Sequence, residues 1–191
     1  MLDLPANWAE NRYPNDSTIY HLGAFERESK RLKVVAASGH QMGMAAAAVL
    51  SHKIINRFRP KYLIMAGIAA GVRGAADIGD VVVADQCWDY GSGKRRVTDG
   101  KAVFLPDPKA IPLALDLKER FQHVQAAGTI MHTVERRWRG ATPGNRLQVR
   151  IGPMASGASV IQDQTIVDEI RAHSRKLTAV DMESYGVFYA A

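Results

Sequence analysis

Short apolar segments alternate along this chain with helix-forming or glycine-containing segments, and this alternation narrows the possible folds more than any other feature. Residues 32–38 (LKVVAAS) are apolar and partly β-branched, which is typical of a buried strand. Residues 39–60 then become rich in alanine and end at a proline, as expected for a helix. Further buried strands are expected at 62–67, 81–84, 146–156 and 177–182.

Two more helical regions separate these expected strands. Residues 163–174 are amphipathic and begin with Asp163, which suits an N-cap. Residues 111–139 have helical content that is expected to break near Gly128. Strands that alternate with helical crossovers predict an α/β fold with a mostly parallel or mixed sheet, covered on both faces, and ligands at the carboxyl ends of its strands.

The remaining segments look irregular. Residues 1–20 contain several turn-forming residues and are expected to be an irregular lead-in, and residues 85–108 are expected to be a loop. A length of 191 residues suits one domain. That domain is predicted to occupy residues 21–191.

Composition excludes several classes of protein. With 47% hydrophobic and 23% charged residues, the chain matches ordinary globular proteins. No apolar stretch approaches the roughly 20 residues of a membrane helix, and the amino terminus lacks the pattern of a signal peptide, so a cytoplasmic location is expected. The single cysteine, Cys87, rules out an internal disulfide and a zinc site built on cysteines.

Positive charge is the strongest bias in the composition. The net charge is +6 and the sequence pI is about 9.6. Basic residues cluster at 30–33, 93–96 and 135–140, where solvated surfaces are favoured over a nucleic-acid site because no nucleic-acid motif accompanies them.

Common cofactor and metal signatures do not fit. The glycines of GIAAGVRG (67–74) have the wrong spacing for a dinucleotide fingerprint, and Lys94 is followed by Arg95 where a phosphate loop has Ser or Thr. No H-E-x-x-H or G-x-S-x-G motif occurs, and His40, beside a glycine turn, is more typical of structure than of a metal ligand. No cofactor and no metal are therefore expected.

Three segments end an expected strand in small residues, namely MAGIAAGV (65–72), MASGASVI (154–161) and AVDMESYG (179–186). Small residues let the backbone approach a ligand, although they also simply permit tight turns. Asp181 and Glu183 add two carboxylates, which an extended segment places on one face and a helix start stabilises. Together these segments favour a pocket.

The same segments carry a family resemblance. YLIMAGIAAGVRGAADIGDVVVAD (62–85), GPMASGASVI (152–161) and LTAVDMESYGVFYAA (177–191) resemble the nucleoside phosphorylase and nucleosidase superfamily, especially 5′-methylthioadenosine/S-adenosylhomocysteine nucleosidase-like domains. The resemblance implies an α/β fold, a three-layer α/β/α sandwich around a central twisted mixed sheet. It also implies that the family's first strand and its last strand and helix are missing from this chain.

The resemblance further implies a site for a small purine nucleoside. Glu183 corresponds to the glutamate that accepts hydrogen bonds from the ribose hydroxyls, and Met182 corresponds to the methionine that lies against the sugar. Val180 is also expected to belong to the substrate site. Val160 and Ile161 correspond to positions that wall the purine. The family also has a loop beside the glycosidic bond of the nucleoside, and this loop corresponds to Gly67, Ile68 and Ala69.

Hydrolysis is favoured over phosphorolysis, because the Arg and Ser that bind phosphate in the phosphorylase branch correspond to Met65 and Ile68. The family's general acid, an aspartate, is expected beyond Ala191, and the glutamate that activates water has no counterpart, so no catalytic residue is assigned. A phosphorylase and a nucleoside-binding sensor without catalysis remain as alternatives. The family also implies a homo-oligomer, either a dimer or a hexamer.

Overall fold

The computed structural model describes residues 8–141, 143–159, 161 and 163–191, and its centre is a five-stranded sheet. In spatial order the strands are β4 (Ala70–Gly71), β10 (Ala179–Asp181), β9 (Val149–Ser156), β5 (Val81–Asp89) and β8 (Ile111–Pro112). The three inner strands, β10, β9 and β5, run parallel, while β4 and β8 pair antiparallel at the edges. The sheet is therefore mixed, and the predicted α/β class is confirmed.

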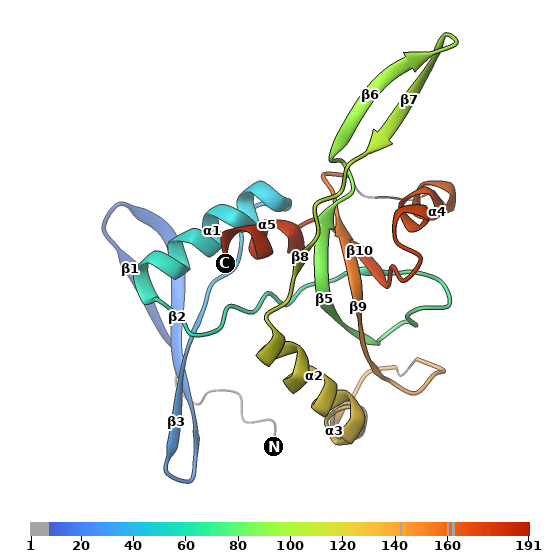
Figure 1. Ribbon diagram of the computed structural model, residues 1–191. Helices are drawn as coiled ribbons and strands as arrows, with labels where there is room; N and C mark the ends of the chain where they lie inside the picture. The colour runs from blue at the N-terminus through green and yellow to red at the C-terminus, as the bar shows by residue number, and fades with distance from the viewer. Residues whose placement is uncertain (1–7, 142, 160, 162) are drawn as a thin grey trace.

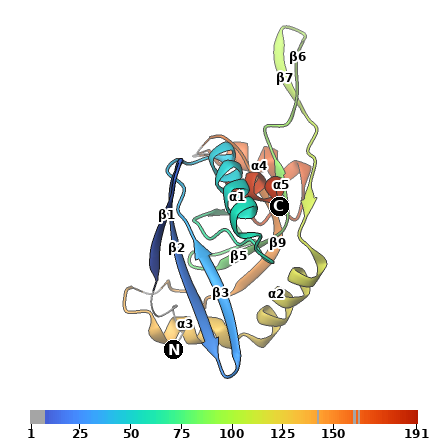
Figure 2. The same ribbon diagram turned by 90° about the vertical axis from the view of Figure 1, so that its left-hand side faces the viewer.

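Helices cover both faces of this sheet (Figures 1 and 2). Alternate residues of a strand point to opposite faces, so neighbouring positions on the inner strands enter different layers. The layer on the side of α4 (Gln164–His173) contains Val72, Trp88, Ala155, Ile170, Leu177 and Val180. The layer on the side of α5 (Ser184–Ala190) contains Cys87, Met154 and Ala179, with Tyr185 and Phe188 packed against it. This is the expected three-layer arrangement.

A second sheet lies beyond the helices. Its antiparallel strands are β1 (Ala9–Tyr13), β2 (Asp16–Arg27) and β3 (Lys30–Ala36). Figure 1 shows α1 (Met44–Phe58) and α5 between this sheet and the central one. Residues 9–13 and 16–20, expected to be irregular, form strands because Thr18 and Tyr20 alternate into a buried layer.

The other helices follow the sequence pattern. Two helices, α2 (Leu115–Ala127) and α3 (Thr129–Arg137), are separated at Gly128, whose φ of 63° lies in the left-handed region that favours glycine. α4 is capped by Asp163, whose carboxylate accepts a hydrogen bond of 2.8 Å from the backbone N–H of Thr165. Both predictions are confirmed. Within the described segments, no helix is long and apolar enough to cross a membrane.

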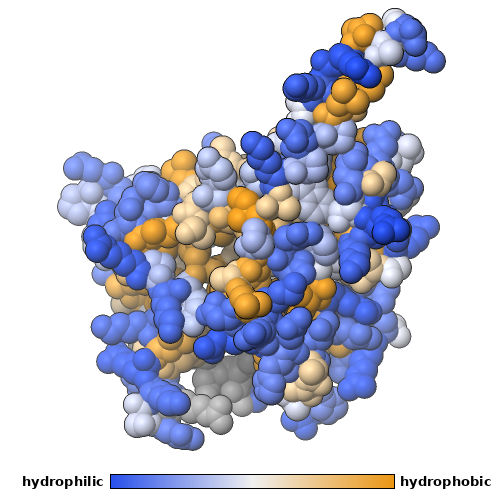
Figure 3. Space-filling model, in the orientation of Figure 1, coloured by the Kyte–Doolittle hydropathy of each residue, from blue (hydrophilic) through white to orange (hydrophobic). Residues whose placement is uncertain are grey.

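Two further segments differ from their prediction. Residues 62–67 do not form a strand, because β10 is only three residues long and pairs with Ala70 and Gly71 alone. Residues 85–108 are not a loop: β5 continues to Asp89, and β6 (Gly93–Thr98) and β7 (Lys101–Pro106) form an antiparallel hairpin. This hairpin projects away from the body of the molecule (Figures 1 and 3).

Candidate functional site

The carboxyl ends of the three parallel strands meet at one edge of the central sheet. Ser156, the last residue of β9, is in register with both Asp89 of β5 and Asp181 of β10. Such an edge is where α/β folds usually bind ligands. Residues 154–156 and 179–181, which begin two of the three segments predicted to form a pocket, therefore lie side by side here.

Asp181 is tied into the protein by hydrogen bonds. Its Oδ1 accepts a bond of 2.6 Å from Ser156 Oγ, and its Oδ2 accepts a bond of 2.9 Å from the backbone N–H of Ser184 and a further bond from the Ser184 hydroxyl. Ser156 Oγ in turn accepts a bond of 2.9 Å from the N–H of Tyr185. Asp181 thus joins the end of β9 to the start of α5, and it fixes the direction in which the chain passes from β10 into α5.

Cys87 lies beside this network but is not a nucleophile. Its Sγ is 3.3 Å from Ser156 Oγ. Burial raises the pKa of the Cys87 thiol to about 12, so the thiol stays protonated near neutral pH.

Glu183 has a different role because it faces a loop rather than a strand. It lies between the end of β10 and the start of α5, and is half-buried. The backbone N–H of Gly43, just before α1, donates to Glu183 Oε1 at 2.8 Å, and that of Met182 donates to Oε2 at 3.3 Å. A carboxylate has about four lone-pair positions. Two backbone donors orient Glu183 and leave acceptor capacity for hydroxyl groups of a ligand.

The loop at 67–69 lies next to this junction in register but has few contacts. β4 pairs Ala70 with Val180 in antiparallel sense, so Ala69 is the next residue along, toward the carboxyl end of β10. Ile68 is 97% exposed, and Gly67 is also exposed. The structure therefore places this loop at the same edge of the sheet as Ser156 and Asp181.

The other predicted site residues are placed differently. Val180 is only 7% exposed and belongs to the core cluster on the α4 side. Ile161 is partly buried against the same cluster. Val160 lies outside the described residues. Of the predicted set, Met182 and Glu183 are the residues that the structure places at the strand-to-helix junction.

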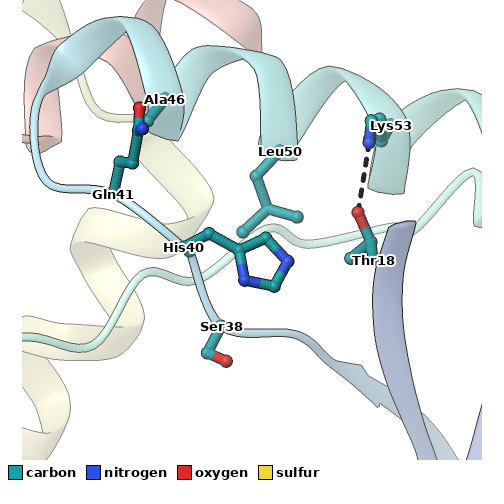
Figure 4. Close-up of a pocket in the computed structure, with 8 residues that line it drawn as sticks. Thr18, Ser38, His40, Gln41, Ala46, Leu50 and Lys53 are labelled. Carbon is teal, nitrogen blue, oxygen red and sulfur yellow. Dashed lines mark hydrogen bonds between the residues drawn. The ribbon is translucent and has the colours of Figure 1, made fainter. Parts of the chain in front are cut away.

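The structure adds a pocket that sequence reasoning did not predict, here called the α1 pocket. It has a volume of about 130 Å³ and lies between β2, the loop after β3, and α1 (Figure 4). Its lining consists of Thr18, Ser38, Gly39, His40, Gln41, Ala46, Leu50 and Lys53. The glycine-rich run SGHQMG (38–43) was the available sequence signal, since it follows a strand and precedes a helix.

Tyr90 is a further residue that sequence reasoning missed. It follows β5 at the same sheet edge, and its hydroxyl donates to the carbonyl of Ser159 at 3.0 Å. Gly157 has no room for a side chain because the Tyr90 ring occupies that space. Tyr90 therefore holds the segment after β9 against the end of β5.

The chain is similar to several known proteins. The family model described as the phosphorylase superfamily matches residues 7–191. Protein y4jS of Sinorhizobium fredii, which is uncharacterized, is 29% identical over 96% of this chain and 45% of its own length. An ATP nucleosidase, Cap17, of Escherichia coli is 25% identical over 87% of this chain and 35% of its own length. The 5′-methylthioadenosine/S-adenosylhomocysteine nucleosidase of Bacillus subtilis is 25% identical over 76% of this chain.

Solved structures show the same fold at lower identity. The 5′-methylthioadenosine/S-adenosylhomocysteine nucleosidase of Colwellia psychrerythraea, crystallised with adenine, superposes with a TM-score of 0.68 at 20% identity, over 97% of this chain and 68% of that one. The futalosine hydrolase of Helicobacter pylori superposes with a TM-score of 0.69 at 16% identity, over 96% of this chain and 68% of that one. The chain spans less than half the length of y4jS and of Cap17.

Proposed function

Because the chain belongs to the phosphorylase superfamily, we propose that it binds an adenosine-type nucleoside at the carboxyl ends of β9 and β10. We further propose that the whole protein hydrolyses the N-glycosidic bond of that nucleoside. Binding is the part of this activity that the described residues carry, and no general acid is assigned among them.

The observation that carries the proposal is the position of Glu183. Two backbone N–H groups orient its carboxylate at the junction of β10 and α5, beside the loop before α1. The two ribose hydroxyls are neighbouring donors that a carboxylate can accept together. Cleavage of an N-glycosidic bond develops positive charge on the sugar, so a carboxylate held there also favours the transition state electrostatically.

The relatives support a nucleosidase rather than a phosphorylase. The relatives reported above that have named activities include an ATP nucleosidase and a 5′-methylthioadenosine/S-adenosylhomocysteine nucleosidase. In this chain, Met65 and Ile68 cannot supply a charge or a hydroxyl to a phosphate beside the glycosidic bond. We therefore propose water as the attacking group, and a cytoplasmic homo-oligomer as the working form.

A product assay tests the reaction. The purified chain is incubated with adenosine, 5′-methylthioadenosine and inosine, with and without phosphate, and free base is measured by chromatography. Base release that does not depend on phosphate supports hydrolysis, whereas phosphate-dependent release would overturn it. Nucleoside binding without base release would indicate a binding module rather than an active enzyme.

A matched pair of variants tests the site itself. Glu183→Gln keeps the shape of the side chain but removes its charge, and we expect adenosine affinity to fall about tenfold or more. Glu119→Gln makes the same change at an exposed position of α2, and should leave affinity unchanged. Equal affinities for both variants would contradict the assignment of Glu183.

A further inference from the structure

The hairpin formed by β6 and β7 carries a dense positive charge. Residues 93–106 contain four basic residues and one acidic residue, a net charge of +3, which is half of the +6 of the whole chain. All four basic residues are exposed, namely Lys94, Arg95, Arg96 and Lys101. Within the described part of the chain, Lys94, Arg96 and Lys101 form no ion pair. Their charge is therefore available to an anionic partner.

The hairpin also stands apart from the rest of the protein. It projects away from the body of the molecule, and hydrophilic and hydrophobic residues are interleaved along it (Figures 1 and 3). Val97, near its tip, is 73% exposed. An isolated two-stranded hairpin is at best marginally stable in water. A bound partner would therefore stabilise this hairpin as well as neutralise its charge.

The strand register places three of the cations on one face of the hairpin. Lys94 and Arg96 are two residues apart on β6 and therefore point to the same side. Lys101 of β7 pairs directly with Thr98, which is the next residue of β6 on that side. Each step of two residues along a strand covers about 7 Å. The three cations thus form a row with regular spacing.

A DNA duplex suits this row better than a lipid surface does. The phosphates of one duplex strand advance about 3.4 Å each along the axis, so cations about 7 Å apart meet every second phosphate. The major groove, about 12 Å wide, admits a two-stranded β-ribbon. On the opposite face of the hairpin, the guanidinium of Arg95 lies 5.9 Å from the centre of the Phe104 ring. Because both faces carry positive charge, neither can enter a bilayer without burying a cation.

We propose that the β6–β7 hairpin is an arm that binds the phosphates of double-stranded DNA through Lys94, Arg96 and Lys101. Contacts to phosphates carry no sequence information, so this binding does not depend on base sequence. The sequence alone favoured a solvated surface at residues 93–96, because no nucleic-acid motif accompanies them. The register and the projection of the hairpin are the observations that favour DNA. The arm does not depend on the proposed nucleoside site.

The salt dependence of DNA binding tests the proposal. The 191-residue chain is titrated into a fluorescently labelled duplex of about 20 base pairs, and anisotropy is measured at several salt concentrations. Three phosphate contacts predict a slope of about −2.7 for the logarithm of the association constant against that of the salt concentration. Affinity should therefore fall about 40-fold between roughly 50 and 200 mM salt. Tighter binding to a single strand, or to phosphatidylserine vesicles, would contradict the assignment of a duplex.

Variants locate the effect on the hairpin. Lys94→Met, Arg96→Met and Lys101→Met should each make the slope shallower by about one, and the triple variant should lose most of its duplex binding. The matched control lowers the net charge equally by changing three exposed arginines at the end of α3 to methionine, namely Arg136, Arg137 and Arg139. The control should keep a slope near about −2.7. Thermal unfolding shows whether both triple variants are folded, and the single variants test the proposal if one is not.

The outcomes decide the proposal. Equal losses in the two triple variants would show that DNA binding follows net charge alone, and the proposal would be wrong. It would also be wrong if the parent chain did not bind the duplex at low salt. A hairpin variant that keeps its duplex affinity but changes its sedimentation coefficient would identify the hairpin as a contact between copies of this chain instead. Glu183→Gln should leave duplex affinity unchanged, so a failure of the nucleoside site is distinguishable from a failure of the arm.

Discussion

Replacement of Asp181 by alanine should destabilise the fold by about 3 kcal/mol, because three hydrogen bonds converge on its carboxylate. The backbone N–H of Ser184 loses its acceptor outright. The two serine hydroxyls lose less, because sulfur atoms offer second partners: Cys87 Sγ lies 3.3 Å from Ser156 Oγ, and Met154 Sδ lies 3.2 Å from Ser184 Oγ. Hydrogen bonds to charged groups contribute about 1.5–3 kcal/mol each, and the total is reduced because Asp181 is only partly buried.

Urea unfolding followed by circular dichroism measures this loss. A change of about 3 kcal/mol moves the midpoint by about 1 M or more. Asp107→Ala, at an exposed position after β7, is the matched control and should stay within about 0.5 kcal/mol of the parent. A loss below about 1 kcal/mol for Asp181→Ala would refute the idea that this carboxylate holds β9 and α5 together.

The remaining predictions concern packing, reactivity and capping. Gly186→Ala should destabilise the protein by about 2 kcal/mol in thermal unfolding, because the carbonyl of Met44 fills the space that a side chain there would need. The control Gly144→Ala meets no atom within 4 Å and should be tolerated. Cys87 should react with iodoacetamide at pH 8 only after unfolding, because burial raises its pKa to about 12; rapid labelling of the native protein would contradict this. The hydrogen bond from Thr165 lowers the pKa of Asp163 below its ordinary value of 3.8, so its capping contribution should be present above that pH and lost as the pH falls through the folded value. The difference in unfolding free energy between the parent and Asp163→Ala should therefore shrink in acid, and a constant difference would count against the cap.

The sequence predicts the three inner strands of the central sheet, β5, β9 and β10, because local pattern and burial agree there. The sequences of β5 and β9 are largely apolar, and both are central strands of a sheet covered by helices on both faces. The resemblance to the nucleoside phosphorylase and nucleosidase superfamily is confirmed as well. Residues 62–67 show the limit of this reasoning. They are as apolar as a buried strand, yet Ile64 is 72% exposed, since pairing with β10 starts only at Ala70.

Long-range contacts account for most of what the sequence could not reveal. The spacing of Asp181 and Glu183 correctly indicates a strand-to-helix junction, but the partner of Glu183 is Gly43, 140 residues away along the chain.

The turn at Asp99 and Gly100 is typical of a hairpin, and both residues have positive φ. The flanking segments lack the alternating pattern of a strand that packs on a core, because β6 and β7 are exposed throughout most of their length.

The most direct test of the central claim compares ribose hydroxyls with Glu183. Adenosine and 2′,3′-dideoxyadenosine are titrated by calorimetry into the parent chain and into Glu183→Gln. If Glu183 accepts hydrogen bonds from these hydroxyls, their removal should weaken binding to the parent about tenfold or more and have little further effect in the variant. The same loss of affinity in parent and variant would show that Glu183 does not bind the ribose.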